Sequence, residues 1–211
     1  MQIIMSLVIG YLIGGINPAY IISRIRGFDI RDRGSGNAGA SNVVITMGKK
    51  AGAFTALFDI SKGAAAALIA AALFPQLRAA KIISGSACIL GHIFPALMHF
   101  HGGKGLASLA GVIMAYDMRF FVILLTIEAV IGLWIDYVCV VPMSGSVIFT
   151  VFYALTSGDP VGTLCLAVAA VVMQFRHIEN LKRIQNGTEA HISFLWRKDK
   201  ELDRIKKNTS T

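Results

Sequence analysis

The chain has 211 residues, of which 55% are hydrophobic and only 15% are charged, and its mean hydropathy is +0.65. Soluble domains are about 45–50% apolar and about 25% charged, so this composition excludes an ordinary soluble globule. The net charge of +8 does not indicate a nucleic-acid partner, because the basic residues flank long apolar runs, as they do in membrane proteins. We therefore expect an all-α polytopic membrane protein that contacts membrane lipids and no nucleic acid.

Apolar segments predict about seven transmembrane helices in a single integral membrane domain over residues 1–211. A spanning helix needs about 20 predominantly apolar residues. Such segments occupy, in chain order, residues 2–23, 51–74, 79–98, 106–116, 120–135, 138–156 and 161–175. The segment at 106–116 is short for a span, and a basic tail begins at about residue 176.

The basic residues predict the orientation of the chain. Sixteen of the twenty Lys and Arg residues lie in residues 24–50, in the loop around residue 104 and in the tail. Because basic loops stay on the cytoplasmic side, we expect the N-terminus outside and the C-terminus in the cytoplasm. This orientation requires an odd number of crossings and places these three regions on one membrane face.

The first candidate site is the loop that reads Gly-Ser-Gly-Asn-Ala-Gly-Ala-Ser-Asn over residues 34–42. Three glycines in six residues allow the backbone to approach a ligand closely and to form a concave nest of N–H groups. Ser35, Asn37 and Asn42 add polar side chains. The pattern predicts an anion-binding loop in which Gly36 supplies backbone contacts.

A second glycine-rich loop, Gly102-Gly103-Lys104-Gly105, carries one lysine. An ammonium group among flexible N–H groups suits a phosphate or a carboxylate. The loop is not a Walker A sequence, because no Ser or Thr follows the lysine. The alternative is a plain turn between helices whose lysine follows the positive-inside rule.

His177 and Asn180 are three residues apart and share a helix face. Histidine is the usual general acid or base near neutral pH, although it can also satisfy a helix end. Glu179 and Arg183 are spaced to pair on another face.

Asp59 and Lys62 lie inside an apolar segment, where charges are costly unless they are paired. We expect them to form a structural ion pair. Glu128 also lies at membrane depth and has no obvious partner in the sequence. Three histidines lie close together in the sequence, namely His92, His99 and His101. Their spacing matches no standard metal template, so we expect no metal.

Together, two glycine-rich loops, a lysine and a His–Asn pair on one membrane face indicate an enzyme that acts on a phosphorylated substrate at the bilayer surface. Two alternatives remain open at this point. One is a non-catalytic membrane protein that binds a lipid or a phosphate, and the other is a transporter for an organic anion.

The same residues resemble the PlsY family of bacterial membrane acyltransferases over nearly the whole chain. The resemblance is carried by segments that occur in the family's order: Gly10–Gly14, Asp29–Asn42, Asp59-x-x-Lys62-Gly63, Gly91-His92-x-Phe94-Pro95, Gly102–Gly105, Arg176–Arg183 and Gly187-Thr188-Glu189. It implies a seven-helix bundle in the bacterial plasma membrane with an active site that faces the cytoplasm.

The resemblance also implies the reaction. A fatty acyl group would pass from acyl phosphate to the 1-hydroxyl of glycerol 3-phosphate, giving lysophosphatidic acid and phosphate in phospholipid biosynthesis. It implies no cofactor and no metal, and it suggests association with the soluble enzyme that makes acyl phosphate.

Residue roles follow from the resemblance as hypotheses. Ser35, His177 and Lys104 would be catalytic: Ser35 would hydrogen-bond the substrate or the developing oxyanion, and Lys104 would neutralise a phosphate. His177 and Asn180 would orient the acceptor hydroxyl, with the base being either His177 or a phosphate oxygen. Substrate binding would extend to Gly36, Asn37, Asn42, Gly102 and Gly103. Glu189, like Asp59 and Lys62, would be structural.

Two segments depart from the family pattern. Ile45 stands where the family carries an arginine, and isoleucine neither donates a hydrogen bond nor carries charge. Asp136-Tyr137-Val138-Cys139 replaces an Arg-Tyr-Val-Ser run, and Pro142 replaces a second serine. These changes predict either weaker binding of glycerol 3-phosphate, a homologue with another acceptor, or loss of activity.

Overall fold

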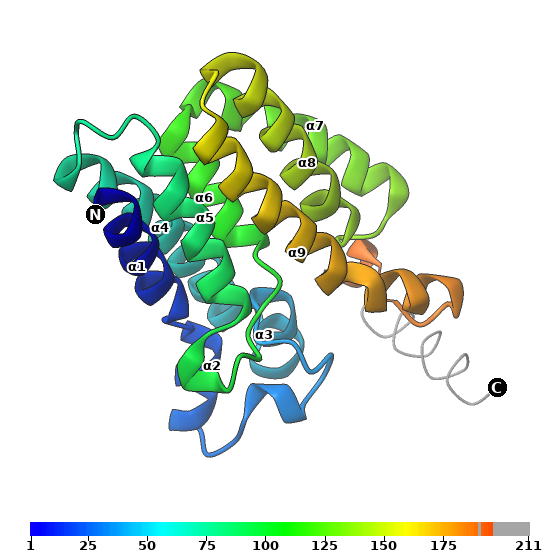
Figure 1. The fold of residues 1–211 in the computed structure, drawn as a ribbon. Coiled ribbons are helices and arrows are strands. Elements are labelled where there is room, and N and C mark those ends of the chain that lie inside the picture. The colour runs from blue at the N-terminus through cyan, green and yellow to red at the C-terminus, as the bar shows by residue number, and fades with distance from the viewer. Residues whose placement is uncertain (190, 196–211) are drawn as a thin grey trace.

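The computed structural model describes residues 1–189 and 191–195, and these residues form a helical bundle without a named β-strand (Figure 1). The α-helices are α1 Gln2–Gly15, α2 Pro18–Ile25, α3 Ala40–Met47, α4 Lys49–Leu73, α5 Ala80–Ile93, α6 Leu106–Tyr116, α7 Met118–Ile135, α8 Val140–Ser157 and α9 Pro160–Gln185. Three short 3₁₀ turns are η1 Ile30–Asp32, η2 Ala96–Met98 and η3 Ile192–Leu195.

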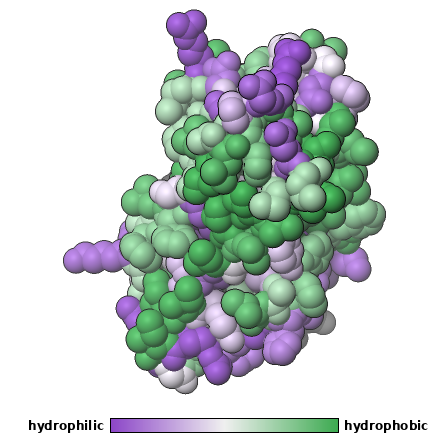
Figure 2. Space-filling view, turned by 60° about the vertical axis from the view of Figure 1, so that its left-hand side comes forward, coloured by the Kyte–Doolittle hydropathy of each residue, from purple (hydrophilic) through white to green (hydrophobic). Residues whose placement is uncertain are grey.

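Six stretches of the described residues are long and apolar enough to cross a membrane. They are Gln2–Ile25, Lys49–Leu73, Ala80–Met98, Met118–Ile135, Val140–Ser157 and Pro160–Gln185. The remaining apolar helix, α6, is shorter, as the sequence indicated. In Figure 2 hydrophobic residues dominate the middle of the visible face, and hydrophilic residues gather toward its two ends. The prediction of an all-α polytopic membrane protein is confirmed.

Small residues let the helices of the bundle approach closely. Gly10 and Gly14 of α1 pack against the backbone of Ser84 and Cys88 in α5, and a Cβ at Gly10 would lie only 2.0 Å from the Ser84 carbonyl oxygen. The GxxxG spacing in α1 is thus a packing surface. A similar contact joins α4 and α6, where Gly63 faces the Ser108 backbone.

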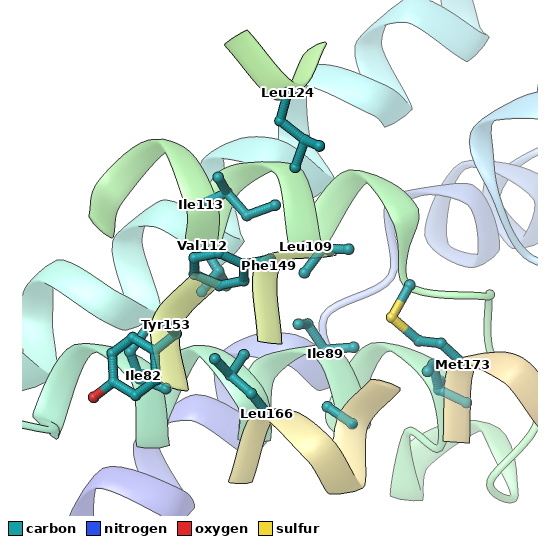
Figure 3. Packing of buried hydrophobic residues seen from close by; sticks show 12 residues of the cluster. Ile82, Ile89, Leu109, Val112, Ile113, Leu124, Phe149, Tyr153, Leu166 and Met173 are labelled. Carbon is teal, nitrogen blue, oxygen red and sulfur yellow. The ribbon is translucent and has the colours of Figure 1, made fainter. Parts of the chain in front are cut away.

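The apolar core lies between α5, α6, α8 and α9 (Figure 3). Ile89 of α5, Val112 of α6, Phe149 of α8 and Met173 of α9 are fully buried and converge there. The core connects two helices that position candidate site residues. One is α6, which follows the glycine–lysine loop, and the other is α9, which carries His177.

The first span is broken between α1 and α2, at Ile16 and Asn17. Ile16 is extended, Asn17 caps α2 by accepting a hydrogen bond from the Tyr20 N–H at 2.9 Å, and Pro18 opens the new helix. The break frees the Ile16 carbonyl from helical bonding, and the Lys62 ammonium donates to it at 2.7 Å. Irregular backbone at membrane depth needs such a partner.

The last helix differs from the sequence-based expectation. We expected the final span to end near Phe175 and a tail to begin at about residue 176, but α9 continues to Gln185. Lys182 and Arg183 occupy its last turn, where basic side chains are favourable for the helix dipole. His177 and Asn180 are therefore fixed on a rigid helix, both buried.

The three regions that carry the candidate site residues lie at one end of the bundle. In Figure 1 the segment 26–39, the connection from α5 to α6 and the C-terminal end of α9 all lie toward the lower end, away from the α4–α5 and α8–α9 connections. The tertiary structure thus brings the three sequence regions to the same end of the molecule.

Asp136, one of the departures from the family pattern, anchors the segment after α9. Its carboxylate accepts hydrogen bonds from the Ser193 backbone N–H at 2.9 Å and from the Ser193 hydroxyl at 3.0 Å. The rings of Tyr137 and His191 lie 4.8 Å apart beside this contact. An acidic residue at position 136 thus has a structural role in this chain.

Candidate functional site

The first loop is held together by Asn42, which is completely buried. Its Oδ1 accepts a hydrogen bond from the Ser35 backbone N–H at 2.9 Å, and its Nδ2 donates to the carbonyls of Ile30 at 3.1 Å and Arg33 at 2.9 Å. Asn42 therefore organises the loop from inside. The substrate-binding role that the resemblance implies for Asn42 is indirect in this geometry.

Glycine is required within this loop for its backbone conformation. Gly34 and Gly36 adopt positive φ angles of 60° and 71°, which residues with a side chain rarely adopt. The Gly36 N–H donates to the Arg33 carbonyl, so it is already used within the turn. The Ser35 side chain, in contrast, is exposed.

The available anion-binding donors lie slightly further along, at the start of α3. Gly39 caps this helix without a side-chain hydrogen bond. The first hydrogen bond of this helix is donated by the Val43 N–H to the Gly39 carbonyl. Among the described residues, the N–H groups of Ala40, Ser41 and Asn42 therefore have no acceptor. A helix N-terminus with free N–H groups favours a phosphate. The nest predicted from the glycines is thus better described as the N-terminus of α3.

Asn37 lies beside this helix start. Its side-chain oxygen is buried and accepts no hydrogen bond within the part of the chain that the structure describes. A buried acceptor without a donor is costly, so the position suits a ligand that carries a hydroxyl group. Among the side chains of the first loop, Asn37 thus carries a buried acceptor that is not used within the loop, whereas the amide of Asn42 is.

Arg31 joins the first loop to the turn before the second. Its guanidinium donates to the Met98 carbonyl at 2.8 Å and forms an ion pair with Asp29 at 2.7 Å. The hydrogen bonds from Arg31 lower the pKa of Asp29. The sequence analysis did not predict this ion pair, and the contact of Arg31 with Met98 depends on the tertiary structure.

The glycine–lysine loop packs against the end of α5. The N–H groups of Gly102 and Gly103 donate to the carbonyls of Ile93 and His92, each at 3.0 Å. A Cβ at Gly102 would lie 2.1 Å from the His92 carbonyl oxygen. These two glycines are therefore required for close packing, and their N–H groups are not available to bind an anion.

Lys104 directs its ammonium group to the side-chain oxygen of Asn180 on α9. The lysine is half-buried, and no carboxylate forms an ion pair with it among the described residues. Burial, with a smaller effect of the Arg183 charge, lowers the pKa of Lys104 to about 8. The site thus contains a desolvated cation whose hydrogen-bond partner is a neutral amide.

A network of hydrogen bonds fixes Asn180. Its Nδ2 donates to Glu189 Oε1 at 2.6 Å, which leaves its oxygen directed at Lys104. The other carboxylate oxygen of Glu189 accepts from Arg183 at 2.6 Å. The predicted pairing of Arg183 with Glu179 is replaced by this ion pair with Glu189. Glu189 thus contacts both Asn180 and Arg183, and its structural role stays a prediction.

His177 is buried on the same helix. Its Nδ1 lies 2.7 Å from the Met173 carbonyl, which accepts a hydrogen bond and so places the ring proton on Nδ1. In the neutral ring, Nε2 then carries the lone pair. This tautomer suits a group that accepts a proton or orients a hydroxyl.

The structure joins Lys104, Asn180 and Glu189 directly, and it places His177 one helical turn before Asn180. Within the described residues, no hydrogen bond or ion pair connects Ser35 or Asn37 to Lys104 or His177. Arg31, which precedes the first loop, instead donates a hydrogen bond to the carbonyl of Met98, which precedes the glycine–lysine loop.

The predicted ion pair of Asp59 and Lys62 is present, with 2.7 Å between Oδ1 and Nζ. His92 contacts both members of this pair through Nδ1, which the sequence did not indicate. All three side chains are buried. Glu128, which had no obvious partner, accepts a hydrogen bond from the Ser144 hydroxyl at 2.8 Å.

An apolar pocket begins immediately after the glycine–lysine loop. It is lined by α6, α7 and α8, with Leu106 at the start of α6 and Ile113 two turns further. The rest of its lining is Leu109, Ala110, Phe121, Leu124, Leu125, Glu128, Val141 and Gly145. Its position next to the Lys104 loop suits the alkyl chain of a lipid-like ligand.

Comparison with known proteins places these features in context. Residues 4–187 match the family model described as glycerol-3-phosphate acyltransferase. A glycerol-3-phosphate acyltransferase of Lactiplantibacillus plantarum is 35% identical over 97% of this chain and its own full length. One of Aquifex aeolicus is 33% identical over 90% of this chain and 98% of its own length.

Two solved structures have the same fold. Both are crystal structures of PlsY, an integral membrane glycerol 3-phosphate acyltransferase, and both are 31% identical and cover 92% of this chain. The glycerol 3-phosphate form superposes with a TM-score of 0.82 and has 98% of its chain covered. The lysophosphatidic acid form has a TM-score of 0.78 and 97% of its chain covered.

Proposed function

Because this chain belongs to the glycerol-3-phosphate acyltransferase family and is an acyltransferase for glycerol 3-phosphate in phospholipid biosynthesis, we propose that its acyl donor is acyl phosphate and that its site faces the cytoplasm. The products are lysophosphatidic acid and inorganic phosphate. The observation that supports this proposal most directly is Lys104, a half-buried cation hydrogen-bonded to a neutral amide. Such a cation is stabilised by an anionic phosphate.

The reaction needs two phosphate-bearing substrates in one site. We assign one phosphate to Lys104 and the other to the free N–H groups at the start of α3. Asn37 then uses its unpaired oxygen to accept a hydrogen bond from a glycerol hydroxyl, and Ser35 donates its exposed hydroxyl to the substrate. The apolar pocket beginning at Leu106 receives the acyl chain.

The chemical step is a single displacement at the acyl carbon. The 1-hydroxyl oxygen of glycerol 3-phosphate bonds to the carbonyl carbon, and the bond from that carbon to the phosphate oxygen breaks. His177 Nε2 orients the hydroxyl, and either this nitrogen or an oxygen of the departing phosphate takes the proton. Acyl phosphate is already reactive, so positioning and charge neutralisation supply the catalysis.

The direct test uses purified protein with palmitoyl phosphate and radiolabelled glycerol 3-phosphate. We expect lysophosphatidic acid from the wild type, and a loss of at least about 100-fold in Lys104→Ala and His177→Ala. Lys182→Ala, an exposed lysine on the same helix as His177, is the matched control and should keep wild-type activity. Product formed from acyl-CoA but not from palmitoyl phosphate would contradict the proposed donor.

The proposed orientation has its own test. In a Cys165→Ala background, a cysteine at the exposed position of Lys182 should react with a membrane-impermeant maleimide only after permeabilisation of the cells. A cysteine at Arg78, an exposed residue in the α4–α5 connection, should react in intact cells. The reverse pattern would show that the site faces outward.

A further inference from the structure

Three side chains that can carry charge meet inside the apolar bundle, on two different helices. Asp59 and Lys62 lie on α4 and His92 lies near the end of α5, and each is at most 4% exposed. Charged groups at membrane depth are costly and are commonly retained for a function. The reaction described above uses none of these three groups.

The Lys62 ammonium has close contacts with a backbone carbonyl and with both other members of the cluster. Its Nζ lies 2.7 Å from the Ile16 carbonyl oxygen, 3.0 Å from His92 Nδ1 and 2.7 Å from Asp59 Oδ1. An ammonium group has three hydrogens and no lone pair, so Nδ1 of His92 accepts from Lys62 when the ring proton lies on Nε2. The same Nδ1 also lies 3.3 Å from Asp59 Oδ1. These contacts fix the orientation of the His92 ring.

The opposite edge of the His92 ring lies against the glycine–lysine loop. A Cβ at Gly103 would stand 2.0 Å from His92 Nε2, and the three heavy atoms nearest to that Cβ all belong to the His92 ring. The Gly103 N–H also donates to the His92 carbonyl at 3.0 Å. Both the backbone and the side chain of His92 therefore determine the position of Gly103.

We propose that the Asp59–Lys62–His92 cluster is a positioning device for Lys104. The ion pair fixes the His92 ring, the ring supports Gly103, and Gly103 immediately precedes Lys104. A shift of this loop displaces the ammonium from its place beside Asn180. This inference rests on the proposed role of Lys104 in binding a substrate phosphate.

The kinetic test compares His92→Ala with His92→Asn. Alanine removes both the acceptor for Lys62 and the support for Gly103, and we expect the KM for one phosphate substrate to rise by about tenfold to a hundredfold. Asparagine can keep an acceptor near Nδ1 and should recover part of the loss. A purely structural role would lower the amount of folded protein and leave the KM of the folded fraction unchanged, which would overturn the proposal.

A size exchange tests the contact itself. Gly103→Ala should strongly reduce acyltransferase activity, because its methyl group meets the His92 ring. The same change should reduce activity much less in a His92→Ala background. Gly102→Ala is the matched control, since its Cβ would meet the His92 backbone carbonyl at 2.1 Å and no side-chain change relieves that clash. Strict additivity of the Gly103 and His92 changes would contradict the proposal.

Hydrogen exchange provides a readout that is independent of activity. In folded His92→Ala, the amides of residues 102–105 should exchange faster than in the wild type, whereas those of α8 should not change. Equal exchange in this loop would refute the positioning role even if the enzyme is active. Absence of lysophosphatidic acid with the wild type would instead contradict the proposed function and leave the hydrogen-exchange result to decide the positioning role.

Discussion

The ammonium group of Lys104 donates a hydrogen bond to the side-chain oxygen of Asn180, which lies 76 residues further along the chain. This contact joins the glycine–lysine loop to α9 and places a cation one helical turn from His177. Because Asn180 is neutral, the contact orients the ammonium without cancelling its charge. The charge of Lys104 therefore remains available to a phosphate.

The first prediction concerns pH. Lys104, with a pKa of about 8, is protonated below that pH, so its charge is lost as the pH rises through 8. We expect the KM for a phosphate substrate to rise above about pH 8 in the wild type. Lys104→Arg keeps a cation at every accessible pH, and its pH profile should lack this alkaline increase. The same increase in the arginine variant would assign it to another group.

The second prediction concerns the orientation of Asn180. Glu189 accepts from Asn180 and from Arg183, each at 2.6 Å. Hydrogen bonds to charged groups contribute about 1.5–3 kcal/mol, so Glu189→Ala should reduce kcat/KM by roughly tenfold to a hundredfold. Glu189→Gln keeps an acceptor for the amide and should lose less. Glu179→Ala, at an exposed position of the same helix, should match the wild type. Equal losses in the Ala and Gln variants would argue against the orienting role.

The third prediction tests the interior of the first loop. Asn42→Asp replaces the Nδ2 donor by a carboxylate oxygen that faces the carbonyls of Ile30 and Arg33. Leaving buried carbonyls without a donor costs about 1–3 kcal/mol per group, so the unfolding temperature should fall and the KM should rise. Ser41→Ala, at an exposed neighbouring position, is the control. An Asn42→Asp protein with unchanged unfolding temperature and KM would contradict this account.

The fourth prediction concerns helix packing. Gly10→Ala places a Cβ 2.0 Å from the Ser84 carbonyl oxygen, whereas a Cβ at Gly15 would meet nothing within 4 Å. Overpacking costs about 1–3 kcal/mol, so only the Gly10 variant should unfold at a clearly lower temperature in detergent. Thermal unfolding monitored by size-exclusion chromatography measures the difference. Equal unfolding temperatures for the two variants would show that α1 and α5 do not pack through Gly10.

The fifth prediction concerns the departure at Ile45. This residue lies half-buried in the last turn of α3, and an arginine there would add a cation and a bidentate phosphate donor. Ile45→Arg should lower the KM for glycerol 3-phosphate, and Ile45→Leu should not change it. An unchanged KM in the arginine variant would mean that other residues already supply this interaction.

The helical class, the six long spans and the weak fourth segment could be predicted from the sequence, because hydropathy and length directly reflect what a bilayer accepts. The extension of α9 to Gln185 could not, since polar residues such as His177 and Asn180 interrupt the apolar pattern. Those residues are tolerated because Met173, Lys104 and Glu189 satisfy their hydrogen bonds.

The sequence by itself determined that this protein spans a membrane and which residue types are available for binding phosphate, because composition and local spacing carry that information. The tertiary structure alone decided which groups are free to act. It uses the N–H groups of Gly102 and Gly103 to end α5, and it leaves the ammonium of Lys104 beside a neutral amide. Hydrogen bonds between residues distant in sequence depend on how helices pack, and helix packing is not encoded in any single segment.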